Sequence, residues 1–155
     1  MSDFSHIEEG RVRMVDIGDK PHVDRRAVAE GVIHLRASTV EAIEGGTVEK
    51  GNVLQTARIA GIQAAKRTPE AIPLCHQVPL SSVDIDFDLE EDRIITRAEV
   101  RTTAQTGVEM EALNAVSGAL LTVWDMVKSL EKDADGQYPS TRIGDIEVVV
   151  KEKGQ

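Results

Sequence analysis

The spacing of apolar residues predicts one long helix between Thr106 and Asp133. Apolar side chains recur there at alternating steps of three and four residues, the spacing of one face of an α-helix: Leu113, Val116, Leu120, Val123, Val127 and Leu130. A second stripe makes the helix apolar over much of its circumference: Ala112, Ala115, Ala119 and Met126. Thr106 and Glu109 have the spacing of a capping box at its start, and Lys128 favours the dipole at its end. We expect a helix roughly 40 Å long that is packed on two sides.

Alternating polar and apolar residues predict the strands. Residues 83–89 alternate strictly, and residues 93–103 return as their partner in a hairpin. Near the start of the chain, residues 11–17 are predicted as a short strand and residues 23–35 as a long one. Residues 141–151 are predicted as the last strand.

Two shorter helices are predicted between the first strands and the hairpin. Ser38 or Thr39 can cap the first helix, which Gly45–Gly46 ends. The second helix begins at the cap Asn52 and ends at Arg67. Its small residues allow another backbone to approach closely: Ala57, Ala60, Gly61, Ala64 and Ala65.

Pro73 and Pro79 predict an extended, stiff segment after a single turn at residues 68–70. Neighbouring side chains of an extended segment point to opposite faces, so Cys75 and His76 are not expected to form a thiolate–imidazole pair with each other. We interpret Cys75 as a small buried hydrophobic residue, which leaves His76 free to reach a pocket.

The order of elements predicts an α+β fold, with helices packed on one face of an antiparallel sheet. We expect residues 1–155 to form a single domain, in which the polar residues 1–9 are mobile. The second face of the sheet is partly apolar, which favours self-association.

The composition excludes several functional classes. A formal net charge of −9 argues against general binding to nucleic acid or to an anionic membrane, and only 3% aromatic residues leaves little surface on which bases can stack. The single cysteine excludes an intrachain disulfide and fits a reducing cytoplasm. The first residues lack a signal pattern, and no run approaches the ~20 apolar residues of a membrane span. We therefore expect a cytoplasmic protein.

Polar residues form one narrow line on the long helix: Glu111, Asn114, Gly118, Asp125 and Lys128. The simpler interpretation makes Glu111 a partner of the helix dipole, and Asp125 with Lys128 an ordinary surface pair. Glu111 and Asp125 lie roughly 21 Å apart along the axis. If both serve one reaction, the site is shared between subunits.

Other residues with chemical potential are less distinctive. The chain has no phosphate loop and no dinucleotide-binding glycine motif, and its four histidines lack the spacing of zinc ligands. Cations gather around the second helix, where they form either a local anion pocket or a solvated face: Lys50, Arg58, Lys66 and Arg67.

Two stretches carry a specific resemblance. Residues 50–80, with the motif PLCH, and residues 106–133, with TGVEMEAL and DMVK, resemble the cyclic pyranopterin monophosphate synthase family of molybdenum cofactor biosynthesis. The resemblance implies a ferredoxin-like α+β subunit assembled into a hexamer, a trimer of dimers with active sites at subunit interfaces. It also implies a lyase that converts 3′,8-cyclo-7,8-dihydro-GTP into cyclic pyranopterin monophosphate and releases pyrophosphate. The pathway partner is then a radical-SAM GTP 3′,8-cyclase that supplies the substrate.

The resemblance also implies roles for individual residues. The catalytic positions that match are Asp125, Lys128 and Lys50. The substrate-binding positions that match are Leu74, Cys75, His76, Glu109, Met110, Glu111, Lys66 and Arg25. Lysines over the triphosphate would stabilise the leaving pyrophosphate, and a desolvated Lys128 beside Asp125 is expected to be tuned toward neutral pH for proton transfer.

The resemblance implies no metal or organic cofactor and leaves a requirement for Mg²⁺ open. One departure is that the lysine- and glycine-rich loop expected before the last strand is missing, so a basic contact from that loop is not expected. Two alternatives remain: a non-catalytic oligomeric module that binds an anionic nucleotide, and a purely structural oligomer.

Overall fold

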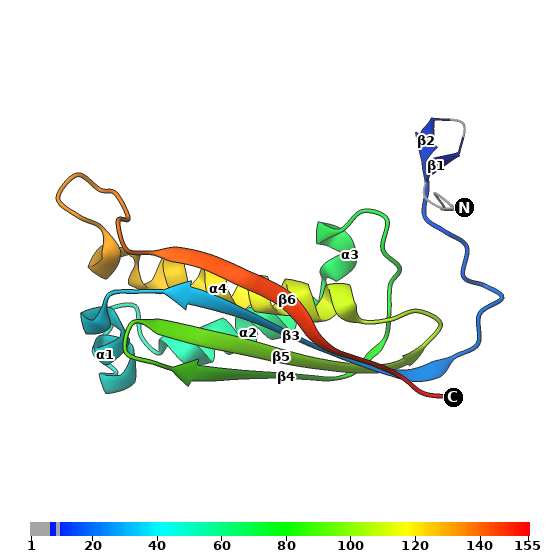
Figure 1. Ribbon diagram of the computed structural model, residues 1–155, viewed down its shortest axis with the longest axis horizontal. Coiled ribbons are helices and arrows are strands. Elements are labelled where there is room, and N and C mark those ends of the chain that lie inside the picture. Colours follow the sequence, from blue (N-terminus) through cyan, green and yellow to red (C-terminus); the bar gives the residue numbers. More distant parts are fainter. Residues whose placement is uncertain (1–6, 9) are drawn as a thin grey trace.

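The computed structural model of the protein describes residues 7, 8 and 10–155 and contains a four-stranded antiparallel sheet (Figure 1). The strands lie in the order β4-β5-β3-β6. Their bounds are β3 Val23–His34, β4 Leu80–Leu89, β5 Arg93–Ala104 and β6 Arg142–Lys153. The predicted long strand, the hairpin and the last strand are confirmed.

The described residues form four helices: α1 Ala37–Gly45, α2 Val53–Lys66, α3 Thr68–Ala71 and α4 Glu109–Glu131. α4 lies along β3 and β5, and α2 lies along β4, so both cover the same face of the sheet (Figure 1). The predicted α+β, ferredoxin-like architecture with helices on one face is confirmed.

The start of the chain differs from the prediction. Only Arg11–Val12 of the predicted strand over residues 11–17 forms a strand, β2, which pairs with β1, Ile7–Glu8. Residues 13–17 are irregular and lead from this hairpin back to the sheet. The predicted mobility of residues 1–9 falls mainly on residues 1–6 and 9, which lie outside the described residues.

Two predicted helix caps are wrong and two are confirmed. α4 begins at Glu109, after Val108 rather than Thr106, with no side-chain cap, and the Glu109 carboxylate pairs with Lys151 of β6. α1 follows Arg36, and the Thr39 hydroxyl donates to Glu131 instead of capping the helix. In contrast, the Asn52 side chain accepts the Gln55 N–H at 3.0 Å, and Gly46 ends α1 in the left-handed conformation.

Small residues set the distance between α2 and α4. A Cβ on Gly118 would lie 2.9 Å from the Cβ of Ala64, and a Cβ on Gly61 would lie 2.9 Å from the backbone oxygen of Ala115. The Asn114 amide donates to the carbonyl of Ala64 at 2.9 Å, which satisfies a backbone group near the end of α2. The polar line predicted on α4 therefore includes positions that face α2 rather than a ligand.

A buried carboxylate ties the other end of α4 to two more elements. Glu131 is fully buried and accepts from the Thr141 hydroxyl at 2.7 Å, from the Arg36 N–H at 3.1 Å and from the Thr39 hydroxyl. The Arg36 guanidinium donates in return to the Glu131 carbonyl at 3.1 Å. Because these donors come from the ends of β3, α1 and β6, a single side chain joins all three elements to α4.

The second face of the sheet is partly apolar, as predicted. Strand register places two ion pairs there, Arg26–Glu99 at 2.8 Å and Arg97–Glu30 at 3.0 Å. Val28, which is fully buried, and Val150 lie between them, and Val32 and Ile95 lie beyond the Arg97–Glu30 pair. This face carries both the charges and the apolar surface that a protein interface requires.

The contact between α2 and α4 generates a prediction for Gly61→Val. Because the backbone oxygen of Ala115 cannot rotate away, the new side chain forces the helices apart, and we expect the free energy of unfolding to fall by about 1–3 kcal/mol. Urea denaturation measures this change. Gln63→Val, at an exposed position of the same helix, is the control. Equal stability of the two variants would contradict the packing argument.

Candidate functional site

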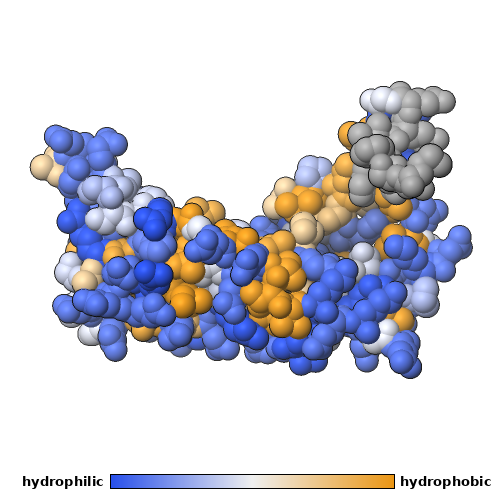
Figure 2. All heavy atoms as spheres, in the orientation of Figure 1, coloured by the Kyte–Doolittle hydropathy of each residue, from blue (hydrophilic) through white to orange (hydrophobic). Residues whose placement is uncertain are grey.

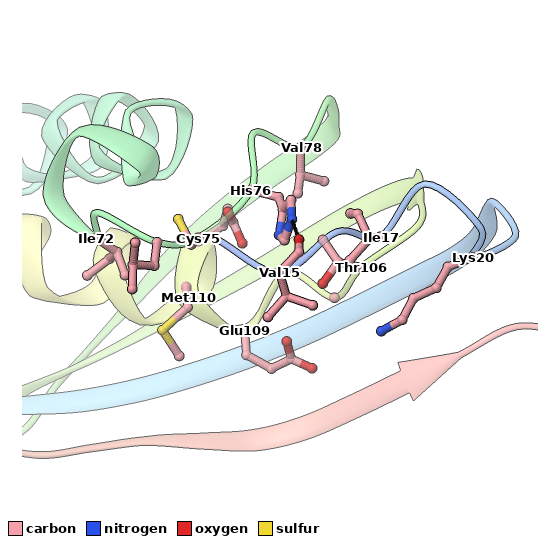
Figure 3. A pocket seen from close by; sticks show the side chains of 13 residues that line it. Val15, Ile17, Lys20, Ile72, Cys75, His76, Val78, Thr106, Glu109 and Met110 are labelled. Carbon is pink, nitrogen blue, oxygen red and sulfur yellow. Dashed lines mark hydrogen bonds between the residues drawn. The ribbon is translucent and has the colours of Figure 1, made fainter. Parts of the chain in front are cut away.

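A pocket of about 650 Å³ lies at the start of α4 (Figure 3). Three segments that are distant in sequence form its wall: the irregular segment after β2, the segment after α3, and the first turn of α4 with the loop before it. The lining residues are Val15, Ile17, Lys20, Ile72, Leu74, Cys75, His76, Val78, Thr106, Gly107, Glu109, Met110 and Glu111. Six of the predicted substrate-binding residues thus lie together: Leu74, Cys75, His76, Glu109, Met110 and Glu111.

The predicted extended conformation of the segment after α3 is wrong for its first residues. Pro73 and Leu74 form a turn, and the Cys75 N–H donates to the Ile72 carbonyl at 3.3 Å. The turn brings both Cys75 and His76 to the pocket, although strict extension would have placed them on opposite faces. His76 is not free, because its Nε2 donates to the Val15 carbonyl and so holds the irregular segment against the pocket (Figure 3).

Glu111 is a buried carboxylic acid in this pocket. Its residue is only 3% exposed, and burial raises the pKa of its carboxyl, with a smaller contribution from the neighbouring charge of Glu109. Burial likewise raises the pKa of the half-buried Cys75 thiol, and Glu111 adds to that effect. Cys75 is therefore held as a thiol and is less enclosed than the predicted buried hydrophobic residue.

Glu109 faces the last strand. Its Oε1 lies 2.9 Å from the Lys151 Nζ of β6, and its carboxylate covers Gly107 so closely that any Cβ there would collide with it. The last strand thus supplies one basic contact, from Lys151 to Glu109, although the lysine- and glycine-rich loop before it is missing. Sequence patterns did not indicate Lys151, since only the sheet register brings residue 151 to the start of α4.

A second cluster lies near the other end of α4. Lys50, in the loop between α1 and α2, donates to the Asp125 carboxylate at 3.1 Å and to the Asp125 carbonyl at 3.2 Å. Lys128, one turn along the helix, contacts the same carboxylate at 2.8 Å. The structure thus brings the three predicted catalytic residues together, with Asp125 between two ammonium groups.

The charges of this cluster reinforce one another. Hydrogen bonds from Lys128 and then Lys50 lower the pKa of Asp125, and Asp125 raises the pKa of Lys128. The expectation of a desolvated Lys128 tuned toward neutral pH is wrong for the single chain. Its side chain is 44% exposed, so the carboxylate contact outweighs desolvation and favours the ammonium form.

The remaining predicted site residues lie elsewhere. Lys66 is exposed at the last turn of α2, roughly 20 Å from Lys50 at its start, so these two lysines favour the solvated face over a single anion pocket, the two interpretations left open for the cations around α2. Arg25 donates to the carbonyls of Ala104 and Gln105 at 3.3 and 3.2 Å, which fixes the loop that leads into α4. Arg25 therefore supports the pocket from outside its lining.

Sequence reasoning also missed Lys20 and Gln105. The Gln105 amide lies 3.1 Å from the carbonyls of Ile17 and Lys20 and 3.2 Å from that of Gly18, so it holds the segment that presents Lys20 to the pocket. The two residues are far apart in sequence, and neither belongs to a regular pattern. Within residues 7–8 and 10–155, no helix is long and apolar enough to cross a membrane.

Glu111 generates a prediction about stability and pH. Because its folded pKa is raised, the folded state binds more protons than the unfolded state, and Glu111 costs stability as pH rises above the ordinary glutamate pKa. We therefore expect Glu111→Gln to melt at a higher temperature than the wild type at neutral pH, with the difference vanishing in acid. Thermal denaturation across pH measures it.

The matched control for Glu111→Gln is Glu109→Gln, two residues away. Glu109 is partly exposed and loses its ion pair with Lys151 on substitution, so no stabilisation is expected from it. A Glu111→Gln protein that melted below the wild type at neutral pH would show that the buried carboxylate contributes favourable contacts instead.

Known proteins match this chain over nearly its whole length. The sequence profile of the MoaC family matches residues 14–154. A protein of Methanothermobacter thermautotrophicus, "Probable cyclic pyranopterin monophosphate synthase accessory protein", is 60% identical over 99% of this chain and 96% of its own length. Two further proteins are each named "Probable cyclic pyranopterin monophosphate synthase". The protein of Methanosarcina mazei is 58% identical over 98% of this chain and 97% of its own length. The protein of Thermococcus kodakarensis is 56% identical over 100% of this chain and 99% of its own length. The chain belongs to the MoaC family.

Proposed function

We propose that the protein converts 3′,8-cyclo-7,8-dihydroguanosine 5′-triphosphate into cyclic pyranopterin monophosphate with release of pyrophosphate, a lyase step of molybdenum cofactor biosynthesis. Family membership and relatives with this name, more than half identical over nearly their full length, support the proposal. The observation that carries it is the arrangement along α4. Carboxylates and a pocket lie at its start, and a carboxylate between two ammonium groups lies near its end.

Each group has chemistry suited to one part of the substrate. Glu109 and Glu111 are acceptors for N–H groups of the guanine-derived part, and the pocket wall is mainly apolar around them. Lys50 and Lys128 both contact the Asp125 carboxylate, and a pair of lysines suits a triphosphate. We assign Lys66 and Lys20 to weaker phosphate contacts, because both are exposed cations, and Arg25 to support of the loop before α4.

The phosphate step has a simple balance. An oxygen of a sugar hydroxyl forms a bond to the α-phosphorus, the bond from that phosphorus to the oxygen bridging to the β-phosphate breaks, and pyrophosphate leaves with that oxygen. Ammonium groups of Lys50 and Lys128 stabilise the charge that develops on the departing oxygens. We assign acceptance of the hydroxyl proton to Asp125 and donation of a proton during ring rearrangement to Lys128.

The distance along α4 supports sites shared between subunits. Glu111 and Asp125 are separated by roughly 21 Å on one rigid helix, which exceeds the reach of a single nucleotide-sized ligand. Exposed apolar residues are available for assembly: Leu121 at 62%, Val12 at 69% and Met14 at 53% exposed. Figure 2 shows hydrophobic surface on the floor of a hollow between the two projecting ends of the molecule. We therefore include a homohexamer, a trimer of dimers, in the proposal.

The proposal has further parts. Residues 1–155 act as one catalytic domain in the cytoplasm, and a radical-SAM GTP 3′,8-cyclase supplies the substrate. The reaction proceeds without a resident metal or organic cofactor. We expect EDTA to leave turnover unchanged, and Mg²⁺ added afterwards to leave it unchanged as well. Turnover that requires added Mg²⁺ would contradict this part of the proposal.

The first experiment supplies the purified protein with 3′,8-cyclo-7,8-dihydro-GTP and measures pyrophosphate and pterin product together. We expect equal amounts of both products from the wild type and a rate at least about 100-fold lower from Lys128→Ala, since an ammonium over the triphosphate is lost. The control is Lys132→Ala, an exposed lysine one turn further along. No turnover, with the substrate still raising the melting temperature, would instead support a non-catalytic nucleotide-binding module.

Mixing of inactive variants tests the shared site. We expect Glu111→Gln and Lys128→Ala to be inactive alone and to regain activity after they are unfolded together and reassembled, because random mixing leaves about one quarter of interface sites with both native residues. Activity of the mixture is compared with each variant reassembled alone. A mixture without activity, from oligomers shown by mass to contain both chains, would place the whole site in one subunit.

A further inference from the structure

The irregular segment of residues 14–20 forms one wall of the pocket at the start of α4, although little of its own backbone bonding holds it there. Among the described residues, its one backbone–backbone hydrogen bond is the turn bond from the Lys20 N–H to the Ile17 carbonyl, at 3.0 Å. Yet Val15, Ile17 and Lys20 all line the pocket. The position of this wall therefore depends on side chains from other elements.

The carbonyl groups of this segment accept hydrogen bonds from both of the other pocket walls. His76, in the segment after α3, donates from its Nε2 to the Val15 carbonyl (Figure 3). Gln105, the first residue of the loop before α4, donates from its side-chain amide to three further carbonyls. These are the carbonyls of Ile17, Gly18 and Lys20, at 3.1, 3.2 and 3.1 Å. The segment is thus fastened to one wall near its start and to the other wall near its end.

Gln105 is itself fixed to the sheet. Its backbone carbonyl and that of Ala104 accept from the Arg25 guanidinium of β3, at 3.2 and 3.3 Å. Three converging carbonyl oxygens repel an amide oxygen and attract an NH₂ group, so these contacts also define the orientation of the half-buried Gln105 amide. Because one NH₂ group serves all three carbonyls, a change at residue 105 releases the segment from this wall at once.

Lys20 is the part of the segment that suits an anionic ligand. It is the one lysine or arginine among the described residues that line the pocket, whose wall also carries Glu109 and Glu111. No described residue forms an ion pair with Lys20. Figure 3 shows its side chain reaching from the segment toward the side of the pocket where Glu109 lies. Without this ammonium, the pocket would present carboxyl groups to a ligand whose phosphates are negative.

We propose that Gln105 is a positioning residue that holds Lys20 at the pocket, where the Lys20 ammonium binds a phosphate of the substrate. The inference rests on the proposed function for the identity of that substrate. The three carbonyl contacts order the segment before the substrate arrives, so binding does not have to supply that conformational entropy. A phosphate keeps its charge from the bound substrate to the transition state. Loss of the contact therefore raises KM more than it lowers kcat.

Proteolysis tests the fastening of the segment without turnover. A protease that cuts before aspartate has two exposed sites within it, Asp16 and Asp19. We expect Gln105→Met, which removes the N–H donors and keeps a side chain of similar length, to speed cleavage at both sites about tenfold. Cleavage before the exposed Asp135, in the loop after α4, is the internal reference. The control is Gln63→Met, at an exposed position of α2, for which wild-type cleavage is expected.

Kinetics test whether Gln105 acts through Lys20. We expect KM for 3′,8-cyclo-7,8-dihydro-GTP to rise about tenfold in Lys20→Ala and in Gln105→Met, with kcat within about threefold of the wild type. The double variant should stay within about twofold of Lys20→Ala, because both changes remove the same contact. If Gln105 only supported the general shape of the pocket, the two effects would multiply to about a hundredfold.

Calorimetric binding of the same compound separates this inference from the proposed function. Wild-type protein that binds the compound without turnover defeats the proposed function, whereas affinities about tenfold weaker in Lys20→Ala and Gln105→Met still support the inference. Wild-type protein that does not bind the compound overturns both.

Three results would overturn the inference alone: unchanged KM and affinity in Gln105→Met, effects that multiply in the double variant, or cleavage of the segment no faster than in the wild type. If Gln105→Met melts below the assay temperature, Gln105→Asn replaces it. The asparagine amide is one methylene shorter, so it cannot reach all three carbonyls.

Discussion

The close contact between α2 and α4 is the constraint on which the rest of the structure depends. Gly61 and Gly118 leave no room for side chains, so the two helices lie with backbone against backbone. Asn114 fixes their register through the Ala64 carbonyl. Because the helices run in opposite directions, the start of α2 lies beside the end of α4, and the end of α2 lies beside the start of α4. This one packing arrangement therefore places Lys50 beside the end of α4 and the segment after α3 beside its start.

The two buried carboxylates of α4 illustrate different solutions to the same energetic problem. Glu131 receives a backbone N–H and two hydroxyl groups, so its burial serves the connection of three elements. Glu111 is almost as buried, yet burial raises its pKa and a neighbouring carboxylate adds to the cost. A buried carboxylate whose oxygens accept several hydrogen bonds connects structural elements. A buried carboxyl whose pKa is raised marks a site where chemistry takes precedence over stability.

The cluster of Lys50, Asp125 and Lys128 is more exposed than the pocket at the other end of the helix. In the single chain, water therefore weakens its ion pairs. Covering by another subunit would remove that water and strengthen every charge interaction in the cluster. Exposure of the three predicted catalytic residues in the isolated chain is thus what a site completed by assembly would show.

The sequence by itself determined the elements and the architecture, because both follow from local periodicity. The three- and four-residue steps of Leu113 to Leu130 specified α4, strict alternation specified the hairpin, and motifs within residues 50–80 and 106–133 identified the family. Those motifs also indicated the residues that meet in each cluster. Helix ends were less predictable, since Thr39 and Glu109 are used in tertiary contacts instead of caps.

Only the tertiary structure decided which side chains meet across large sequence separations. The turn at Pro73–Leu74 brought Cys75 and His76 to one pocket, and the sheet register brought Lys151 to Glu109. Gln105 contacts three backbone carbonyls, and the Tyr138 ring packs against Trp124. Both residues lie in loops without a periodic pattern. Charge state was also decided there, because solvent exposure and the distance to Asp125 made Lys128 a stable ammonium. Distances and burial arise from the packing of the whole chain, so spacing in the sequence cannot encode them.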